Sequence, residues 1–157
     1  VDEKVSLAAA GTTVSGDDPS IILEGNITYN DLDEDGLLAI AENDVLLGLT
    51  IPDDMEVNGI FVAQNGRYGR NYYQTSSSYD VLSFHNSYVC RNSLTMNGTI
   101  VSNGRVGTKW TGSGCGGYSS GFDTRFNTYD RNLVENPPPL VPNTSDVYEF
   151  TEWREED

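Results

Sequence analysis

The sequence predicts a single all-β domain, 1–157, built as a short right-handed parallel β-solenoid with long loops and a proline-rich C-terminal segment. A strand-like stretch with Asn-Gly corners occurs twice, at 55–66 (MEVNGIFVAQNG) and at 94–104 (LTMNGTIVSNG). Glycine supplies 16 of 157 residues, hydrophobic residues only 37%, and no segment has the pattern of a convincing helix. Strands that recur with glycine at the same corner predict stacked coils, each burying its apolar face on the next.

The two copies align closely but differ in spacing. Residues 57–59 (VNG) match 96–98 (MNG), and each copy ends in a second Asn-Gly followed by an arginine, Arg67 or Arg105. The copies lie 39 residues apart at the first Asn-Gly and 38 at the second, which excludes a regular array of identical coils. We therefore expect two neighbouring strands, with a fainter third copy at 21–29 (IILEGNITY).

The first third of the chain is expected to contain short strands separated by turns. Residues 1–19 are small and turn-rich and predict a flexible or capping lead-in, whereas residues 20–29 alternate as a strand does. The stretch 37–51 (LLAIAENDVLLGLTI) has the length and composition of a helix, but its Asn-Asp step is a turn signal. We expect strand–turn–strand there, with strands at Leu37–Ala41 and Val45–Thr50.

A long excursion follows each clear copy, which predicts loops that emerge on one side of the domain. The excursions are 67–90, rich in Tyr, Ser and Asn, and 106–122, rich in Gly. Three consecutive prolines, Pro137–Pro139, then predict polyproline II structure within an extended C-terminal segment, 135–157. A last short strand is expected at Val147–Trp153.

The net charge of −15 is unevenly distributed along the chain. Residues 1–56 hold 14 acidic side chains and one basic one, residues 57–134 hold seven basic and three acidic ones, and residues 135–157 hold seven acidic and one basic. This balance argues against nucleic-acid binding, which needs a positive field. The acidic ends serve solubility, or they help neighbouring chains to align on the basic middle.

Two cysteines, Cys90 and Cys115, flank the second copy and lack the histidine pair that a zinc site needs. An extracellular disulfide is the preferred interpretation, and two buried thiols in a reducing compartment are the alternative. A bond across 25 residues stabilises a fold by about 3 kcal/mol. Three sequons, at Asn26, Asn97 and Asn143, are candidate glycosylation sites and fit an extracellular or cell-surface location. No apolar run is long enough for a transmembrane segment, and no signal peptide opens the chain.

One acidic stretch predicts a calcium site. It matches the spacing D-x-D-x-D-G-x5-E, in which alternate carboxylates on a tight turn converge on one ion. The predicted ligands are Asp31, Asp33, Asp35, the backbone carbonyl of Leu37, and Glu42. The alternative is an unoccupied acidic surface turn, because strands rather than helices are expected on both sides. Calcium is the only cofactor that the sequence suggests.

An enzyme is not expected. Glycoside hydrolysis needs two carboxylates across a cleft, and the candidates here qualify by residue type alone. They are Asp17, Asp18, Asp53, Asp54, Asp80, Asp123 and Asp130, with Arg125 as a cationic neighbour. The single histidine, His85, has no recognisable nucleophile motif to serve and is expected to be structural or exposed.

The first excursion is the best candidate for a binding surface. Tyrosine provides contact area at low entropic cost, and the neighbouring Ser and Asn side chains adapt their hydrogen bonds to a glycan or a protein. The residues concerned are Tyr68, Tyr72, Tyr73, Tyr79 and Tyr88. The alternative is that these tyrosines cover the open side of the fold. Trp110 and Trp153 are expected to be packing residues.

Several segments, taken in order, resemble a bacterial domain of uncharacterised function found in PilX-like, type IV pilin-related pilus-assembly proteins and in other secreted surface proteins. The segments are AIAENDV (39–45), IPDDMEVNGIFVAQNGRYGRNYY (51–73), NSLTMNGTIVSNGRVG (92–107), GYSSGF (117–122), YDRNLVENPPPLVP (129–142) and the Tyr–Trp–Arg-Glu ending (148–155). The resemblance implies a β-rich structural role with no catalytic residues to transfer. Family members usually begin with a hydrophobic helix, which this sequence does not show.

We therefore expect a non-catalytic extracellular structural or adhesive module of a pilus or cell-surface assembly. Its partners would be other protein subunits, copies of itself, or glycans. One alternative is a carbohydrate-binding or polysaccharide-processing β-helix. Another is the repeating subunit of an extracellular filament, because parallel strands at the two ends of such a fold have unpaired edges.

Overall fold

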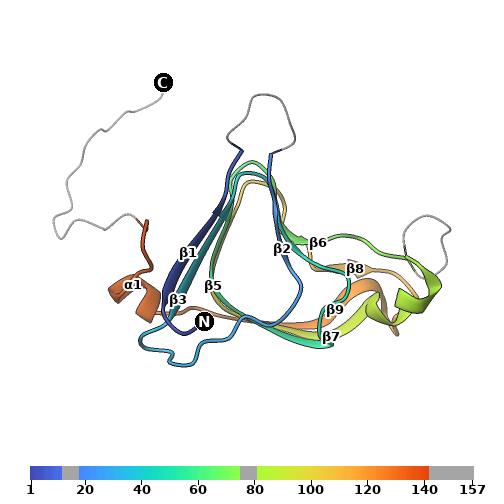
Figure 1. The fold of residues 1–157 in the computed structure, drawn as a ribbon. Coiled ribbons are helices and arrows are strands. Elements are labelled where there is room, and N and C mark those ends of the chain that lie inside the picture. The colour runs from blue at the N-terminus through green and yellow to red at the C-terminus, as the bar shows by residue number, and fades with distance from the viewer. Residues whose placement is uncertain (12–17, 75–80, 142–157) are drawn as a thin grey trace, which may run out of the picture.

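The computed structural model describes residues 1–11, 18–74 and 81–141. Figure 1 shows two β-sheets inclined around a common interior. The larger sheet has the strand order β1-β3-β5-β7-β9-β8, and the smaller sheet has the order β2-β4-β6. The strands are β1 (Lys4–Ala9), β2 (Ile21–Leu23), β3 (Gly36–Ala41), β4 (Val45–Leu47), β5 (Asp54–Ala63), β6 (Tyr68–Arg70), β7 (Cys90–Ser102), β8 (Lys109–Thr111) and β9 (Tyr118–Thr128). The described residues also form two short helices, the 3₁₀ helix η1 (Ser83–Tyr88) and α1 (Asn132–Glu135).

The predicted parallel β-solenoid is wrong. The chain does alternate between the two sheets from β1 to β6, and consecutive strands of each sheet pair in parallel. After β7, however, β8 joins the larger sheet and pairs with β9 in the antiparallel direction, so the sheet is mixed and no closed solenoid forms. The cause is the turn 112–117 (GSGCGG), whose four glycines all adopt positive φ and reverse the chain.

The doubled Asn-Gly motif holds the two longest parallel neighbours together. The pair at 58–59 in β5 lies directly beside the pair at 97–98 in β7. Gly59 and Gly98 have φ values of 145° and 139°, and a Cβ atom on Gly98 would collide with the carbonyl oxygen of Gly59. Only glycine permits this close approach of two backbones. The prediction that the copies are neighbouring strands is therefore confirmed.

Other expected elements are only partly confirmed. The stretch 37–51 does form strand–turn–strand, as β3 and β4 with a turn at 42–44. The fainter copy at 21–29 is confirmed in part: Ile27 forms a parallel bridge with Val57 of β5, whereas β2 belongs to the smaller sheet and pairs with β4. The lead-in contains β1, and the excursions contain β6, η1 and β8. The expected strand at Val147–Trp153 lies outside the described residues.

The segment after β9 returns to the β1 and β3 side of the molecule. The Asn132 amide donates to the carbonyl of Leu32 (2.8 Å), and the hydroxyl of Ser6 donates to the carbonyl of Pro139. Pro138 packs against Gly36 at the start of β3. This crossing connects the two ends of the larger sheet over its outer face.

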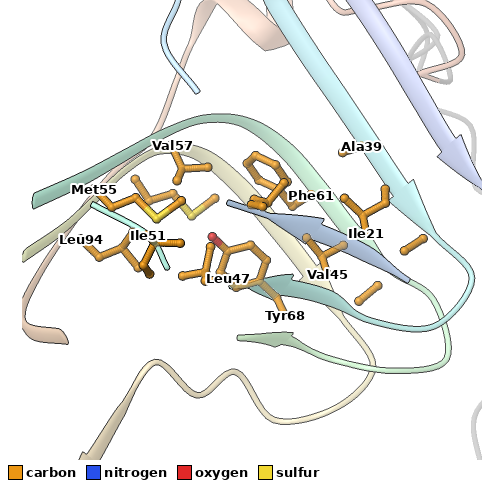
Figure 2. Packing of buried hydrophobic residues seen from close by; sticks show 14 of the residues in the cluster. Ile21, Ala39, Val45, Leu47, Ile51, Met55, Val57, Phe61, Tyr68 and Leu94 are labelled. Carbon is orange, nitrogen blue, oxygen red and sulfur yellow. The ribbon is translucent and has the colours of Figure 1, made fainter. Parts of the chain in front are cut away.

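An apolar cluster fills the space between the sheets (Figure 2). Side chains from both sheets meet there, and the Phe61 and Tyr68 rings lie 5.7 Å apart between their centroids. The buried members are Ile21, Leu23, Leu37, Ala39, Ala41, Val45, Leu47, Ile51, Met55, Val57, Phe61, Ala63, Tyr68, Leu94, Met96 and Phe122. Burial of these side chains is the main force that holds the sheets together.

One fully buried cation borders this cluster. Arg70, at the end of β6, has 0% exposure, and its guanidinium donates to four backbone carbonyls: Gly48 (3.2 Å), Leu49 (3.2 Å), Tyr88 (2.6 Å) and Val89 (3.0 Å). No carboxylate among the described residues forms an ion pair with it. Burial lowers the pKa of Arg70 to about 10, so the group stays charged at neutral pH. Arg70 thus joins the segment after β4 to the segment before β7.

Replacing Arg70 with methionine is expected to lower the free energy of unfolding by about 3 kcal/mol or more. Four buried carbonyls lose their donor, and an unsatisfied buried acceptor costs about 1–3 kcal/mol. Urea denaturation with the disulfide intact measures the loss. The exposed Arg105→Met serves as the control and is expected to change stability by less than about 0.5 kcal/mol. Equal stability of the two variants would show that Arg70 does not hold these segments.

Tyr68 places a hydroxyl in the apolar interior. The side chain is 1% exposed and lies among Leu47, Ile51 and Met55 (Figure 2), and its oxygen has no hydrogen-bond partner among the described residues. Burial also raises the pKa of Tyr68, so the hydroxyl stays neutral in the folded protein at pH values where the unfolded chain ionises.

Tyr68→Phe is expected to increase the free energy of unfolding at pH 7 by about 1 kcal/mol, because it removes an unpaired buried polar group. The wild type should also lose stability above pH of about 10, where Tyr68 ionises only in the unfolded chain, and the variant should lack this part of the loss. Urea titrations at neutral and alkaline pH test both effects. Tyr129→Phe, at a 63% exposed position, should show neither of them.

Candidate functional site

The predicted calcium ligands form a hydrogen-bonded turn at the start of β3. Asp35 accepts from the backbone N–H groups of Asn30 (2.8 Å) and Asp31 (3.0 Å). Asp31 accepts from the N–H of Asp33 (2.8 Å), and Asp33 accepts from the amide of Asn132 (3.0 Å). These carboxylates bond to backbone and amide donors and stabilise the turn.

Glu42 does not lie with the other three acids. It follows the opposite end of β3, about 20 Å along an extended strand, where it accepts from the N–H of Gly11 (2.6 Å). Leu37 is buried, and its N–H donates to the hydroxyl of Tyr29 (3.0 Å). Within residues 1–11, 18–74 and 81–141 no cluster of three metal-type side chains occurs. The calcium site stays a prediction, and this geometry does not assemble the full ligand set.

The five tyrosines proposed as a binding surface are dispersed. Tyr68 is a core residue, Tyr73 stacks on the Arg70 guanidinium at 4.9 Å, and Tyr88 lies under the Arg91 guanidinium at 5.0 Å. Tyr72 alone is an exposed large side chain, and it packs on Trp110 with 5.9 Å between ring centroids. Tyr79 lies outside the described residues. The four tyrosines that the structure describes therefore share no exposed surface, since Tyr72 alone among them is exposed.

Two of the three sequons can be placed. Asn26 is exposed, and its side-chain oxygen accepts from the N–H of Glu56 (3.1 Å). Asn97 is half-buried in β7, and its side-chain oxygen accepts from the hydroxyl of Thr128 (3.0 Å). Asn143 lies outside the described residues. Asn26 is thus the more accessible of the two acceptors.

Each described carboxylate that was considered for catalysis has a hydrogen-bond or ion-pair partner. Asp123 pairs with Lys109 (2.8 Å), whereas Asp130 is buried and accepts from the N–H of Asn132 (3.0 Å). Asp53 lies 3.8 Å from a nitrogen of Arg91. Asp54 accepts from Asn92 and Ser93, Asp18 accepts from Asn65, and Asp17 and Asp80 lie outside the described residues.

The predicted disulfide between Cys90 and Cys115 is confirmed, with 5.7 Å between the Cα atoms. It ties the first residue of β7 to the glycine-rich turn between β8 and β9. The N–H of Cys115 donates to the carbonyl of Tyr118 (2.8 Å), which closes the turn. The bond therefore fixes the turn between β8 and β9 to the start of β7 within the larger sheet.

A basic pocket lies next to this disulfide-held region. Its volume is about 570 Å³, and most of its lining comes from the chain between β7 and β8 and from β8 itself. The lining residues are Arg67, Arg105, Val106, Gly107, Thr108, Lys109, Trp110, Thr111 and Arg125. Four cations thus surround one hollow in a chain whose net charge is −15.

The four cations are held to different degrees. Arg67 donates to Asn71 (2.7 Å), Lys109 pairs with Asp123, and Arg125 approaches the hydroxyl of Thr108 at 3.5 Å. Arg105 is exposed and forms no ion pair with any residue that the structure describes. The pocket therefore offers positive charge to an outside ligand, most directly through Arg105.

The sequence contains one signal for this pocket. Arg67 and Arg105 follow the second Asn-Gly in each copy, and the parallel register brings them together: the N–H of Gly104 donates to the carbonyl of Gly66 (2.7 Å). Their positions in the two copies predict neighbouring arginines but do not by themselves predict a binding site. Lys109 and Arg125 have no sequence pattern that links them to this pair.

No family model, curated protein or solved structure matches the chain. The resemblance to PilX-like pilus-assembly proteins therefore stays a prediction. No helix in the described part of the chain is long and apolar enough to cross a membrane.

Removing the disulfide as Cys90→Ser with Cys115→Ser is expected to lower the free energy of unfolding by about 3 kcal/mol, because a 25-residue loop is no longer closed in the unfolded chain. Urea denaturation compares the variant with the oxidised wild type. An intact mass of the wild type that shows two free thiols would contradict the bond, as would equal stability of the two proteins.

Proposed function

We propose that the protein is a non-catalytic adhesive module of a pilus or another cell-surface assembly, and that it binds an acidic carbohydrate in the basic pocket. The gathering of four cations around Trp110 in a chain of net charge −15 carries the proposal. The disulfide between Cys90 and Cys115 supports a location outside the cell, where such bonds persist.

The charge of the pocket favours an anionic ligand. An arginine presents a planar fork of donors that matches a carboxylate or a sulfate in two-pronged geometry. Arg67 and Arg105 lie side by side on neighbouring stretches of chain, and Arg125 adds a third guanidinium from β9. Polymers of uronic acids or sulfated sugars carry a carboxylate or a sulfate on every sugar or every second sugar. One bound oligosaccharide can therefore contact several cations of the pocket.

The aromatic side chains favour a sugar as the carrier of that charge. Trp110 lines the pocket, and Tyr72 packs on it, which fixes the orientation of the indole ring. A fixed aromatic face packs well on the apolar face of a sugar ring. The pocket volume of about 570 Å³ lies within the range of about 300–1,000 Å³ typical of small-ligand sites.

The lining supports binding rather than hydrolysis. Glycoside hydrolysis uses two carboxylates, one on each side of the scissile bond. The described residues that line this pocket are cations, Trp110, two threonines, a valine and a glycine. Asp123 pairs with Lys109 of the lining but is not itself a lining residue. We therefore favour recognition of a carbohydrate over its cleavage.

Trigalacturonate is expected to bind the wild type, and its fully methyl-esterified form, which has the same skeleton without charge, is expected to bind at least about 10-fold more weakly. Loss of one charge-assisted hydrogen bond costs about 1.5–3 kcal/mol, or a factor of about 10–100 in Kd. Arg105→Glu and Trp110→Ala should each weaken binding of trigalacturonate by at least about 10-fold. Isothermal titration calorimetry measures these affinities.

Arg131→Glu is the matched control, since it makes the same charge change at an exposed residue outside the pocket. It should leave the affinity within about 2-fold, because screening removes most long-range effects at physiological salt. Equal binding of the ester and the acid would contradict an anionic ligand. Equal losses in Arg131→Glu and Arg105→Glu would contradict the pocket as the site.

A further inference from the structure

The larger sheet has two edges that no described strand covers. β1 is the first strand of the sheet order and pairs with β3 alone. At the other end, β8 pairs with β9 only at Tyr118–Gly121, so the stretch Asp123–Thr128 has no strand on its outer side within the described residues. This stretch is as long as β1. Uncovered edges of this kind are templates for another chain.

The hydrogen bonds to β3 show which groups of β1 face outward. The carbonyls of Glu3 and Ala9 accept from the N–H groups of Gly36 (3.3 Å) and Glu42 (2.9 Å). Because bonding alternates along a strand, Lys4, Ser6 and Ala8 direct their N–H and C=O groups away from β3. The outer edge of β1 therefore presents a row of backbone donors and acceptors.

The same reasoning applies to β9. The N–H of Ser93 donates to the carbonyl of Asp53 (3.1 Å), so the next residue, Leu94, bonds to β9 on the other side of β7. The parallel register places Leu94 opposite Arg125, and Leu94 bonds to the residues on both sides of Arg125. Arg125 and Asn127 therefore direct their backbone groups outward.

The side chains of β1 indicate that its end of the interior is incomplete. Val5 lies beside Leu37 and Leu7 beside Ala39, and both partners belong to the buried cluster. Val5 and Leu7 are nevertheless 44% and 50% exposed, because no strand lies beyond β1 in the described structure. In the Asp123–Thr128 stretch of β9, Phe126 is 56% exposed. Another strand on either edge would remove this apolar surface from water.

The charges of the two ends are complementary. Residues 1–56, which include β1 and its surroundings, carry 14 acidic side chains and one basic one. Residues 57–134, which include β9, carry seven basic and three acidic ones, and the basic pocket lies at this end. Two identical edges would repel each other at either end, whereas a β1 end and a β9 end attract.

We propose that β1 of one copy of this chain pairs in parallel with the Asp123–Thr128 edge of β9 in a second copy. Strands β1, β3, β5, β7 and β9 all run parallel, so a second β1 beside β9 continues the direction of the sheet. The β1 edge and the β9 edge are different surfaces, so a copy that is bound through one of them leaves the other uncovered. Such a heterologous contact extends head to tail rather than closing as a symmetric dimer.

The contact does not require a carbohydrate, so its failure would leave the proposed function untouched. Sedimentation experiments are therefore made on the full chain without saccharide. The wild type is expected to show a mass that rises with protein concentration beyond that of a dimer, and the association should weaken as salt is added.

Proline at an outward-facing position removes one edge without removing a bond inside the sheet. Ala8→Pro is expected to block the β1 edge and Asn127→Pro the β9 edge, and Ala8→Ser and Asn127→Ser are the controls. Each proline variant alone should remain monomeric at every concentration. A mixture of the two should form a one-to-one dimer and nothing larger, because one uncovered β1 edge and one uncovered β9 edge remain.

Several outcomes would overturn the proposal. The first is a wild type that stays monomeric at every concentration. The second is a proline variant that still dimerises alone, which would indicate a symmetric contact. The third is a mixture of the two proline variants that stays monomeric although both melt as cooperatively as their serine controls. If a proline variant does not fold, the same sedimentation experiment is made on Asn127→Glu and Asn127→Lys instead. The glutamate should abolish association with the acidic end and the lysine should preserve it, and equal behaviour of the two would contradict the contact.

Discussion

The guanidinium of Arg70 is the interaction on which the arrangement of the later strands depends. It is fully buried, and its four hydrogen bonds join Gly48 and Leu49, which follow β4, to Tyr88 and Val89, which precede β7. A buried cation is stable only when hydrogen bonds replace its lost water, and four carbonyl dipoles do so here. The position at which β7 begins, and with it the anchor of the disulfide, therefore follows from one side chain of the smaller sheet.

The close backbone approach at the Asn-Gly corners then sets the register of the long strands. With Gly59 beside Gly98, every residue of β5 has a defined partner in β7, and the two arginines that follow the copies become neighbours. The pocket is thus a consequence of strand register combined with a chain reversal at the glycine-rich turn. Its charge is opposite to that of the molecule as a whole, which makes one end of the larger sheet basic and the other acidic.

The features that sequence reasoning identified are those with short-range causes. The turn between β3 and β4 follows from its Asn-Asp step, and the disulfide follows from two cysteines in a chain without zinc ligands. The calcium pattern illustrates the limit of such reasoning. Its spacing suits a loop that folds back on itself, but β3 extends between Asp35 and Glu42 and moves the last acid to the far end of the strand.

By itself, the sequence determined a β-rich chain, the pairing of the two Asn-Gly copies and the bond between Cys90 and Cys115. Only glycine fits a corner where two backbones approach closely, and two cysteines allow only one disulfide within the chain. Local chemistry is therefore sufficient to predict these features. Only the tertiary structure decided that β8 turns back against β9, that Tyr68 and Arg70 are buried, and that four cations meet in one pocket. The physical reason is that an arginine or tyrosine suits either the interior or the surface, and which one it occupies depends on contacts between residues far apart in the chain.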